Sequence, residues 1–287
     1  MPEVKVFADA AEFYERAEPF LLRCEAEHNL ILGVVGGLVG SASPRYVDPF
    51  LATVEQGGAV VGAAMRTPPH NLVLSEGLDG DAIASLARAV RAVYAELPGV
   101  SGPRAGAREF ADQWQAATGQ PFEVAMARRI YKLSRVRPAA LVPGYMRPGM
   151  PADRDLLMRW LRGFHEDVSV DASSIEEAAN RYMAHEGRSI YFWDDGGPVS
   201  MAGCCGRTQH GMRIGPVYTP PSHRCRGFAS ACVAALSQRL LDEGRTFCFL
   251  YTDLGNPTSN HVYQAIGYEP VADVDTYRFG AVSEAAG

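Results

Sequence analysis

The chain has 287 residues, of which 47% are hydrophobic and 21% charged, and its formal net charge is −6. This length accommodates one large domain or two of ordinary size, and the acidic balance argues against a broad nucleic-acid-binding surface. The six cysteines include no C-x-x-C pair, so neither a zinc ribbon nor a disulfide framework is expected. The start of the chain does not resemble a signal peptide, and no apolar run is long enough to span a bilayer. We therefore expect a cytoplasmic protein with no membrane role.

Helices and strands alternate in the first half. Apolar spacing predicts one or two helices over residues 10–38, in which His28 and Asn29 are interpreted as making a local polar contact. The elements expected after them are strands over 46–54, 59–65 and 71–76, helices over 82–97 and 108–118, and a long strand over 122–133.

Residues 137–151 contain four prolines and two glycines, a composition typical of a linker. This predicts one domain over residues 1–136 and another over 152–287. The elements expected in the second domain are helices over 153–163 and 174–185, then strands over 189–193, 199–207, 212–218, 246–252 and 276–279.

The two halves resemble each other. Gly57-Gly58 followed by Arg66-Thr67 parallels Gly196-Gly197 followed by Arg207-Thr208. A later match, residues 115–119 against 263–267, is offset further, because the second half is longer between the two matches. We interpret the halves as two copies of one fold. The first copy has a short, acidic loop where the second has extra residues, so we expect no cofactor site in the first.

The extra residues belong to the stretch Ile214–Glu243. It reads as a short strand, a Pro-Pro step, a basic loop containing Arg224 and Arg226, and a helix with an apolar stripe. The free N–H groups at a helix start favour an anion, and the small residues Gly227 and Ala229 let a ligand approach closely. The stretch therefore predicts a phosphate-binding loop.

The spacing R-x-x-G-x-A at Arg224, Gly227 and Ala229 resembles the phosphate loop of the GNAT acetyltransferase superfamily. Residues 253–268, which place Tyr263 shortly before Gly267-Tyr268, look like a later block of the same family. The resemblance implies an α/β (α+β) protein of two tandem GNAT-like folds, each a twisted, mixed, mostly antiparallel sheet flanked by helices. It also implies an N-acetyltransferase that moves an acetyl group from acetyl-CoA to a primary amine of a small molecule or peptide. The amine would attack directly, in a ternary complex.

The resemblance assigns residues to this chemistry. Tyr263 would be the general acid that protonates the leaving thiolate. Glu166 or His165 would be the general base, and Asp253 is a further candidate for holding a cationic acceptor. Asn256, Asn260 and Tyr263 would share one helical face and a polar site. The residues expected to bind the cofactor are Val217, Tyr218, Thr219, Arg224, Cys225, Arg226, Gly227, Phe228, Ala229, Ser230 and Asn256. Cys204 and Cys205 are interpreted as buried strand residues, and no metal is expected.

An alternative from another class is a non-catalytic acyl-CoA-binding or sensing module. Within the enzyme class, acceptors like those of mycothiol synthase or of antibiotic-modifying enzymes remain open. The sequence contains no motif that selects the acceptor, the acyl chain length, the role of the first copy, or a monomer over a homodimer.

Overall fold

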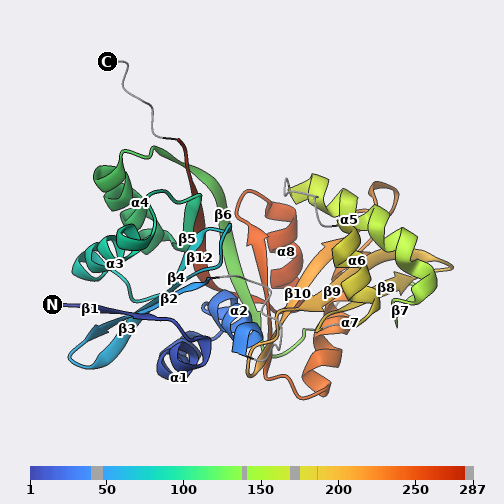
Figure 1. Ribbon diagram of the computed structural model, residues 1–287. Helices are drawn as coiled ribbons and strands as arrows, with labels where there is room; N and C mark the ends of the chain where they lie inside the picture. Colours follow the sequence, from blue (N-terminus) through green and yellow to red (C-terminus); the bar gives the residue numbers. More distant parts are fainter. Residues whose placement is uncertain (40–47, 138–140, 169–174, 186, 282–287) are drawn as a thin grey trace. The chain divides into compact units, whose positions relative to one another are not determined.

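The computed structural model describes residues 1–39, 48–137, 141–168, 175–185 and 187–281, and these form two compact units (Figure 1). The first unit comprises Met1–Ile130 and Val271–Gly287, and the second comprises Tyr131–Pro270. The boundaries cut through strands β6 (Phe122–Leu133) and β12 (Glu269–Phe279), so each of these strands contributes residues to both units.

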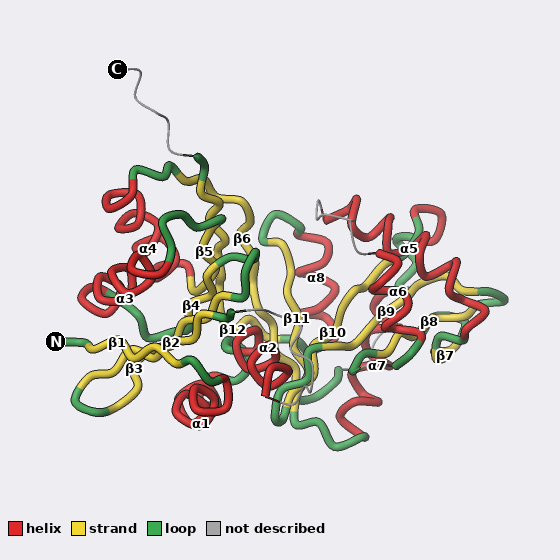
Figure 2. The backbone as a smooth tube through the Cα atoms, viewed as in Figure 1, coloured by secondary structure: helices red, strands yellow, loops and turns green. Residues whose placement is uncertain are grey.

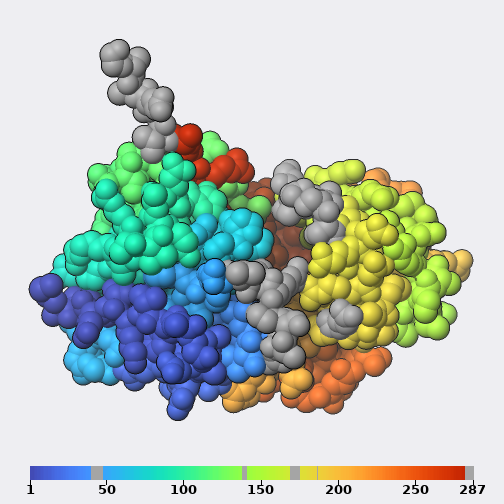
Figure 3. All heavy atoms as spheres, in the orientation of Figure 1, coloured from blue at the N-terminus to red at the C-terminus, as the bar shows by residue number. Residues whose placement is uncertain are grey.

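In the first unit, helices cover both faces of the sheet (Figure 2). One core forms between the sheet and α3 and α4, and another forms against α1 and α2. The strand order is β1-β2-β3-β4-β5-β12-β6. The residues of α3 and α4, teal in Figure 3, form an outer layer of this unit. Its elements are β1 (Glu3–Phe7), α1 (Ala10–Leu21), α2 (Asn29–Val39), β2 (Phe50–Gln56), β3 (Ala59–Arg66), β4 (Leu72–Leu74), α3 (Gly80–Val93), β5 (Gly99–Pro103), α4 (Arg104–Thr118) and most of β6 and β12.

In the second unit, α5 and α6 pack on one face of the sheet and α7 packs on the other. The strand order from the end of β6 is β6-β11-β10-β9-β8-β7. Its further elements are β7 (Tyr145–Pro148), α5 (Arg154–Val168), α6 (Ile175–Met183), β8 (Ser189–Asp194), β9 (Pro198–Cys205), β10 (Gly211–Tyr218), α7 (Phe228–Asp242), β11 (Phe247–Asp253) and α8 (Pro257–Ile266).

The order strand, two helices, three strands, helix, strand, helix, strand therefore occurs twice, from β1 to β6 and from β7 to β12. The sequence matches fall on equivalent elements. Gly57-Gly58 and Gly196-Gly197 form the β2–β3 and β8–β9 turns, and the later match ends α4 and α8. The described elements thus agree with the expected mixed sheet flanked by helices, in two copies.

The predicted boundaries need correction in two places. The expected linker 137–151 includes a strand, because β7 pairs with β8 from Tyr145↔Asp194 to Pro148↔Tyr191; residues 138–140 lie outside the described part. The last strand begins at Glu269 rather than at residue 276, and its residues 274–278 pair antiparallel with β5 in the first unit. A division of the sequence at a predicted linker assigns each domain one continuous stretch of chain, so it cannot predict a first unit whose final strand comes from the far end of the chain.

Strand β5 was missed because Gly99-Val-Ser-Gly-Pro103 reads as a turn. Both glycines allow close strand contacts. A Cβ on Gly99 would collide with the Tyr277 carbonyl oxygen, and one on Gly102 would lie 2.8 Å from Cβ of Leu74. The helix predicted over 82–97 ends earlier, at Val93. Leu97, which precedes the proline expected to stop the helix, is buried although it lies outside the helix.

Two buried polar side chains join segments of the first unit. His28 Nδ1 lies 2.9 Å from the Leu21 carbonyl oxygen, a local contact as expected, but the Glu76 amide also donates to Nε2 at 3.1 Å, a long-range contact that the sequence did not predict. Gln120 Oε1 accepts from Trp114 Nε1 at 2.8 Å and from the Leu97 amide at 3.0 Å. Among the described residues, no helix is long and apolar enough to span a membrane, and no group of metal ligands is found.

Candidate functional site

The site begins where β10 and β11 separate. These parallel strands pair at Gly211↔Phe247, Met212↔Cys248 and Arg213↔Phe249, yet β10 continues to Tyr218 and β11 to Asp253. After Arg213, therefore, the edge of β10 that faces β11 has no ladder partner in these strands. Unpaired main-chain groups on such an edge can hydrogen-bond an extended ligand.

An irregularity in β10 lies at the same point. The register with β9 shifts between Ile214 and Val217, where the intervening Gly215-Pro216 inserts an extra residue. An extra residue bends its strand and increases the local twist. The bend accounts for the divergence of β10 from β11 and places Val217 and Tyr218 beside the resulting gap.

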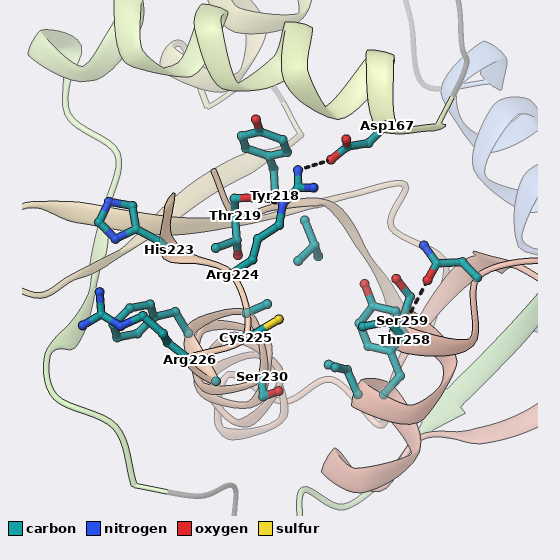
Figure 4. Close-up of a pocket in the computed structure, with 17 residues that line it drawn as sticks. Asp167, Tyr218, Thr219, His223, Arg224, Cys225, Arg226, Ser230, Thr258 and Ser259 are labelled. Atoms are coloured by element: carbon teal, nitrogen blue, oxygen red, sulfur yellow. Dashed lines mark hydrogen bonds and ion pairs between the residues drawn. The ribbon is translucent and has the colours of Figure 1, made fainter. Parts of the chain in front are cut away.

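A cavity of about 540 Å³ opens beside these residues (Figure 4). It is bounded by the end of β10, the following loop, the start of α7 and one face of α8. The lining residues are Asp167, Val217, Tyr218, Thr219, His223, Arg224, Cys225, Arg226, Gly227, Phe228, Ala229, Ser230, Asn256, Thr258, Ser259, Val262 and Tyr263. The structure thus brings together every residue that the sequence assigned to cofactor binding, and also Tyr263.

The start of α7 supplies main-chain donors to this cavity. Gly227, at the N-cap, has φ 80°, a left-handed conformation that glycine adopts readily, and no side chain caps the helix. The first turn carries no acidic residue, so the amides of Phe228, Ala229 and Ser230 and the positive end of the helix dipole are directed at the cavity without a competing carboxylate. Such a helix start binds phosphate groups.

The two loop arginines already have partners. Arg224 Nε donates to the Thr219 carbonyl at 2.9 Å, and Nη2 lies 2.6 Å from Asp167 Oδ2. Figure 4 shows this side chain extending from the loop toward Asp167. Arg226 lies over the Phe228 ring, with Nη2 3.9 Å from Asp195 Oδ2. The groups in the Arg224–Asp167 pair are 43% and 46% exposed, so water screens the pair and a phosphate can compete with Asp167 for the guanidinium.

Tyr263 faces the cavity from α8. Burial raises the pKa of its hydroxyl to about 12, and no hydrogen-bond partner for this hydroxyl is found among the described residues. The group is therefore a neutral donor whose acceptor would have to come from a ligand or water. The Tyr263 ring packs edge-on against Tyr268, with 6.0 Å between centroids, which fixes its position.

The expected polar face of Asn256, Asn260 and Tyr263 is only partly correct. Asn256 lines the cavity, but its Oδ1 caps α8 by accepting from the Ser259 amide at 3.0 Å. Asn260 does not line the cavity. Its amide nitrogen donates to the Asp253 and Asn256 carbonyls, and its Oδ1 accepts from Thr252 Oγ1. It therefore ties the end of β11 to α8. Asp253 likewise forms a turn, in which its Oδ1 accepts from the Gly255 amide.

Glu166, predicted as a general base, is exposed and does not line the cavity, whereas its neighbour Asp167 does. The helix predicted to stop near Gly163 continues to Val168, so both residues lie on α5. Successive residues of an α-helix point about 100° apart, so only one of the two can face the loop. His165 is also absent from the lining. Cys204 and Cys205 are 5% and 6% exposed, as expected of buried strand residues.

The sequence reasoning missed Asp167, His223, Thr258, Ser259 and Val262. For the α8 residues a signal existed: Thr258, Ser259, Val262 and Tyr263 have the spacing of one helical face adjoining the block around Asn256. Gly163 also bears on the site, because a Cβ there would collide with the Tyr218 hydroxyl. A glycine inside a helix gives no sequence signal for such a contact.

Residues 193–278 match the model of a family described as FR47-like protein. No curated protein matches the chain. Solved structures share the fold at low identity. A Drosophila protein has a TM-score of 0.68 at 12% identity, with 99% of this chain and 100% of that one covered.

A GCN5-related N-acetyltransferase from Sphaerobacter thermophilus has a TM-score of 0.61 at 14% identity, covering 96% of this chain and 95% of its own. A tandem GNAT protein from the clavulanic acid biosynthesis pathway has a TM-score of 0.57 at 15% identity, covering 99% and 100%. Together with the repeated element order, these similarities show that the chain has the fold of these GNAT proteins.

Proposed function

We propose that the second unit binds acetyl-CoA and transfers its acetyl group to the primary amine of a small molecule or peptide. The observation that carries this proposal is the single cavity onto which an uncapped helix start and an unpaired strand edge both open. The uncapped helix start suits a pyrophosphate, and the unpaired strand edge suits an extended pantetheine arm with its amide groups.

The residues divide the binding between them. The amides from Cys225 to Ser230 would hold the pyrophosphate, with Arg226 adding charge and Arg224 exchanging Asp167 for a phosphate oxygen. The main chain of Val217 to Thr219 would bind the pantetheine arm. An N–H group on this edge would donate to the thioester carbonyl oxygen as it gains negative charge.

The reaction needs an uncharged amine, which attacks the thioester carbonyl carbon, and it breaks the carbon–sulfur bond. The Tyr263 hydroxyl would donate its hydrogen bond to the departing sulfur. Neither Glu166 nor His165 lines the cavity, so we assign no general base to them. The ammonium proton would leave through the acceptor side of the site or through water.

The corresponding corner of the first unit has a different construction, which supports a structural role for that copy. After β4, the connection to α3 carries Glu76 and Asp79, and Asp81 lies in the first helical turn. Leu78 in this connection is buried, and Gly102 brings β5 against Leu74, so the strands stay close. Acidic side chains at a helix start would repel a pyrophosphate.

Cys225 provides a test that does not depend on turnover. Cys225 is exposed and lines the cavity. Cys24 is exposed too, but it belongs to the first unit and does not line the cavity, so it serves as an internal control. Coenzyme A should slow the alkylation of Cys225 by iodoacetamide and leave the alkylation of Cys24 unchanged, as measured by peptide mass spectrometry. Isothermal calorimetry should show one coenzyme A site per chain.

If coenzyme A neither binds nor protects Cys225, the proposal is wrong. If coenzyme A does bind, a scan of amine acceptors in the presence of acetyl-CoA, with release of coenzyme A as the readout, separates an enzyme from a non-catalytic acyl-CoA-binding module. The module would show protection of Cys225 without acceptor-dependent release.

A further inference from the structure

Two arginines and a cysteine form a row across the sheet of the second unit. Cys205 on β9 pairs with Arg213 on β10, and Ser189 on β8 pairs with Cys204, so Arg188 lies beside Cys205. Directly opposite residues share a face of the sheet. The face is that of α6, because the Arg188 guanidinium lies 5.2 Å from the centre of the Tyr182 ring. Tyr182 is itself buried, and its hydroxyl donates to the Gly215 carbonyl at 3.1 Å.

Most of the guanidinium donors in this row have no acceptor among the residues that the structure describes. Arg213 Nη2 donates to Cys205 Sγ at 3.1 Å, and no other hydrogen bond of this guanidinium is found in the described part of the chain. Arg188 Nε is buried without a partner, and the described residues provide no carboxylate within ion-pair distance of either arginine. A guanidinium has five N–H donors in a planar fork, so the pair leaves several of them unused.

Five other arginines of this unit, by contrast, have a carboxylate within 4.0 Å: Arg147, Arg154, Arg224, Arg226 and Arg239. Some that have none in the described part, such as Arg135, Arg159 and Arg162, are exposed to water. Arg188 and Arg213 are partly exposed and lie around a buried tyrosine, and among the described residues it is the Cys205 thiol, not a carboxylate, that lies between them. Two positive charges brought together in this way disfavour the folded chain unless an anion joins them. Their forks match a carboxylate.

The row adjoins the proposed transfer site. Arg213 is the last residue of β10 that pairs with β11, so it lies where the two strands begin to separate. Val217, at the cavity, lies four residues further along the strand, roughly 13 Å for extended backbone. Gly215, whose carbonyl binds Tyr182, lies between them. An acceptor whose amine reaches the gap beside Val217 could therefore extend its other end to Arg213.

We propose that Arg188 and Arg213 bind the carboxylate of the acyl acceptor, so that the substrate class is an amine with a carboxylate several bonds away. This inference rests on the proposed function of the second unit. It goes beyond it by naming the acceptor chemistry and two residues that select it.

The test compares 6-aminohexanoate with 6-aminohexanamide as acceptors, because the two differ only in the carboxylate. Release of coenzyme A should give the carboxylate a kcat/KM at least tenfold higher. This preference should fall to near unity in Arg213→Gln and in Arg188→Gln, through a higher KM. Arg207→Gln, which removes an exposed arginine of the neighbouring loop, should keep the preference.

A second readout needs neither turnover nor coenzyme A. Millimolar glutarate should raise the Tm of the wild-type protein and of Arg207→Gln, but not of Arg213→Gln, while glutaramide should raise none of them. Calorimetry with coenzyme A tests the proposed function separately. Equal use of the two acceptors, no Tm effect of glutarate, or a preference that survives in both arginine variants would overturn the carboxylate site. Stronger use of an aminoalkyl phosphate than of the carboxylate would overturn it in favour of a phosphate.

Discussion

Replacing Tyr263 with phenylalanine tests the chemistry of the site most directly. The change removes one hydroxyl that faces the cavity and has no hydrogen-bond partner among the described residues, while it keeps the ring that packs on Tyr268. We therefore expect the fold and the Tm to be nearly unchanged. The affinity for coenzyme A should change little as well, because the proposed pyrophosphate contacts come from the start of α7.

The pKa of Tyr263 fixes the expected magnitude. With a pKa of about 12, roughly one hydroxyl in a thousand is ionised at pH 9, so the donor is intact from pH 6 to 9. The same value exceeds that of an ordinary thiol, about 8.5, so full proton transfer to the thiolate costs ~5 kcal/mol. In the proposed reaction Tyr263 would therefore act mainly as a hydrogen-bond donor to a charged sulfur, an interaction worth about 1.5–3 kcal/mol. Turnover should fall roughly 10- to 150-fold.

The assay is acceptor-dependent release of coenzyme A, measured from pH 6 to 9, with calorimetry for binding. The loss in Tyr263→Phe should be constant over this range, because the group does not titrate within it. Tyr268→Phe is the matched control. It removes a buried hydroxyl bonded to Ser237 at 2.8 Å and should lower the Tm without selectively lowering turnover. Unchanged turnover in Tyr263→Phe at every pH would refute the assignment.

Three further predictions concern the loop and the first unit. Asp167→Asn should free Arg224 and tighten coenzyme A binding up to about fivefold, as expected for an exposed ion pair, whereas Glu166→Gln should not; equal calorimetric effects would contradict the pairing. Gln120→Leu should leave the Trp114 and Leu97 donors unpaired and cost about 2–5 kcal/mol in urea unfolding, against nearly none for the exposed Gln115→Leu. Burial lowers the pKa of His28 below its ordinary 6.5, so as the pH falls the unfolded chain takes up the proton before the folded chain does. The contribution of neutral His28 to the free energy of unfolding is therefore complete above pH 6.5 and declines as the pH falls below that value. The pH dependence of unfolding should therefore be weaker in His28→Gln, and an identical slope would exclude the effect.

Local sequence determined the predicted phosphate loop and the elements on either side of it. A strand, a small-residue loop and an apolar-striped helix are specified by spacings within about thirty residues, and such short-range patterns survive in any tertiary context. The same holds for the matched glycine turns and for the later match of residues 115–119 with 263–267, from which two copies were predicted. The residues predicted to bind the cofactor, Asn256 apart, fall within one such stretch, and this explains why all of these line one cavity, which Asn256 lines as well.

Only the tertiary structure decided what depends on distant segments. The final strand completes the first unit because β12 pairs with β5, which are separated by more than 160 residues of chain. The choice of Asp167 over Glu166 depends on one further turn of α5, and the row of Arg188, Cys205 and Arg213 depends on strand register. Register and helix phase are set by packing against other elements, so a one-residue difference that sequence reasoning cannot resolve reverses which side chain faces the site.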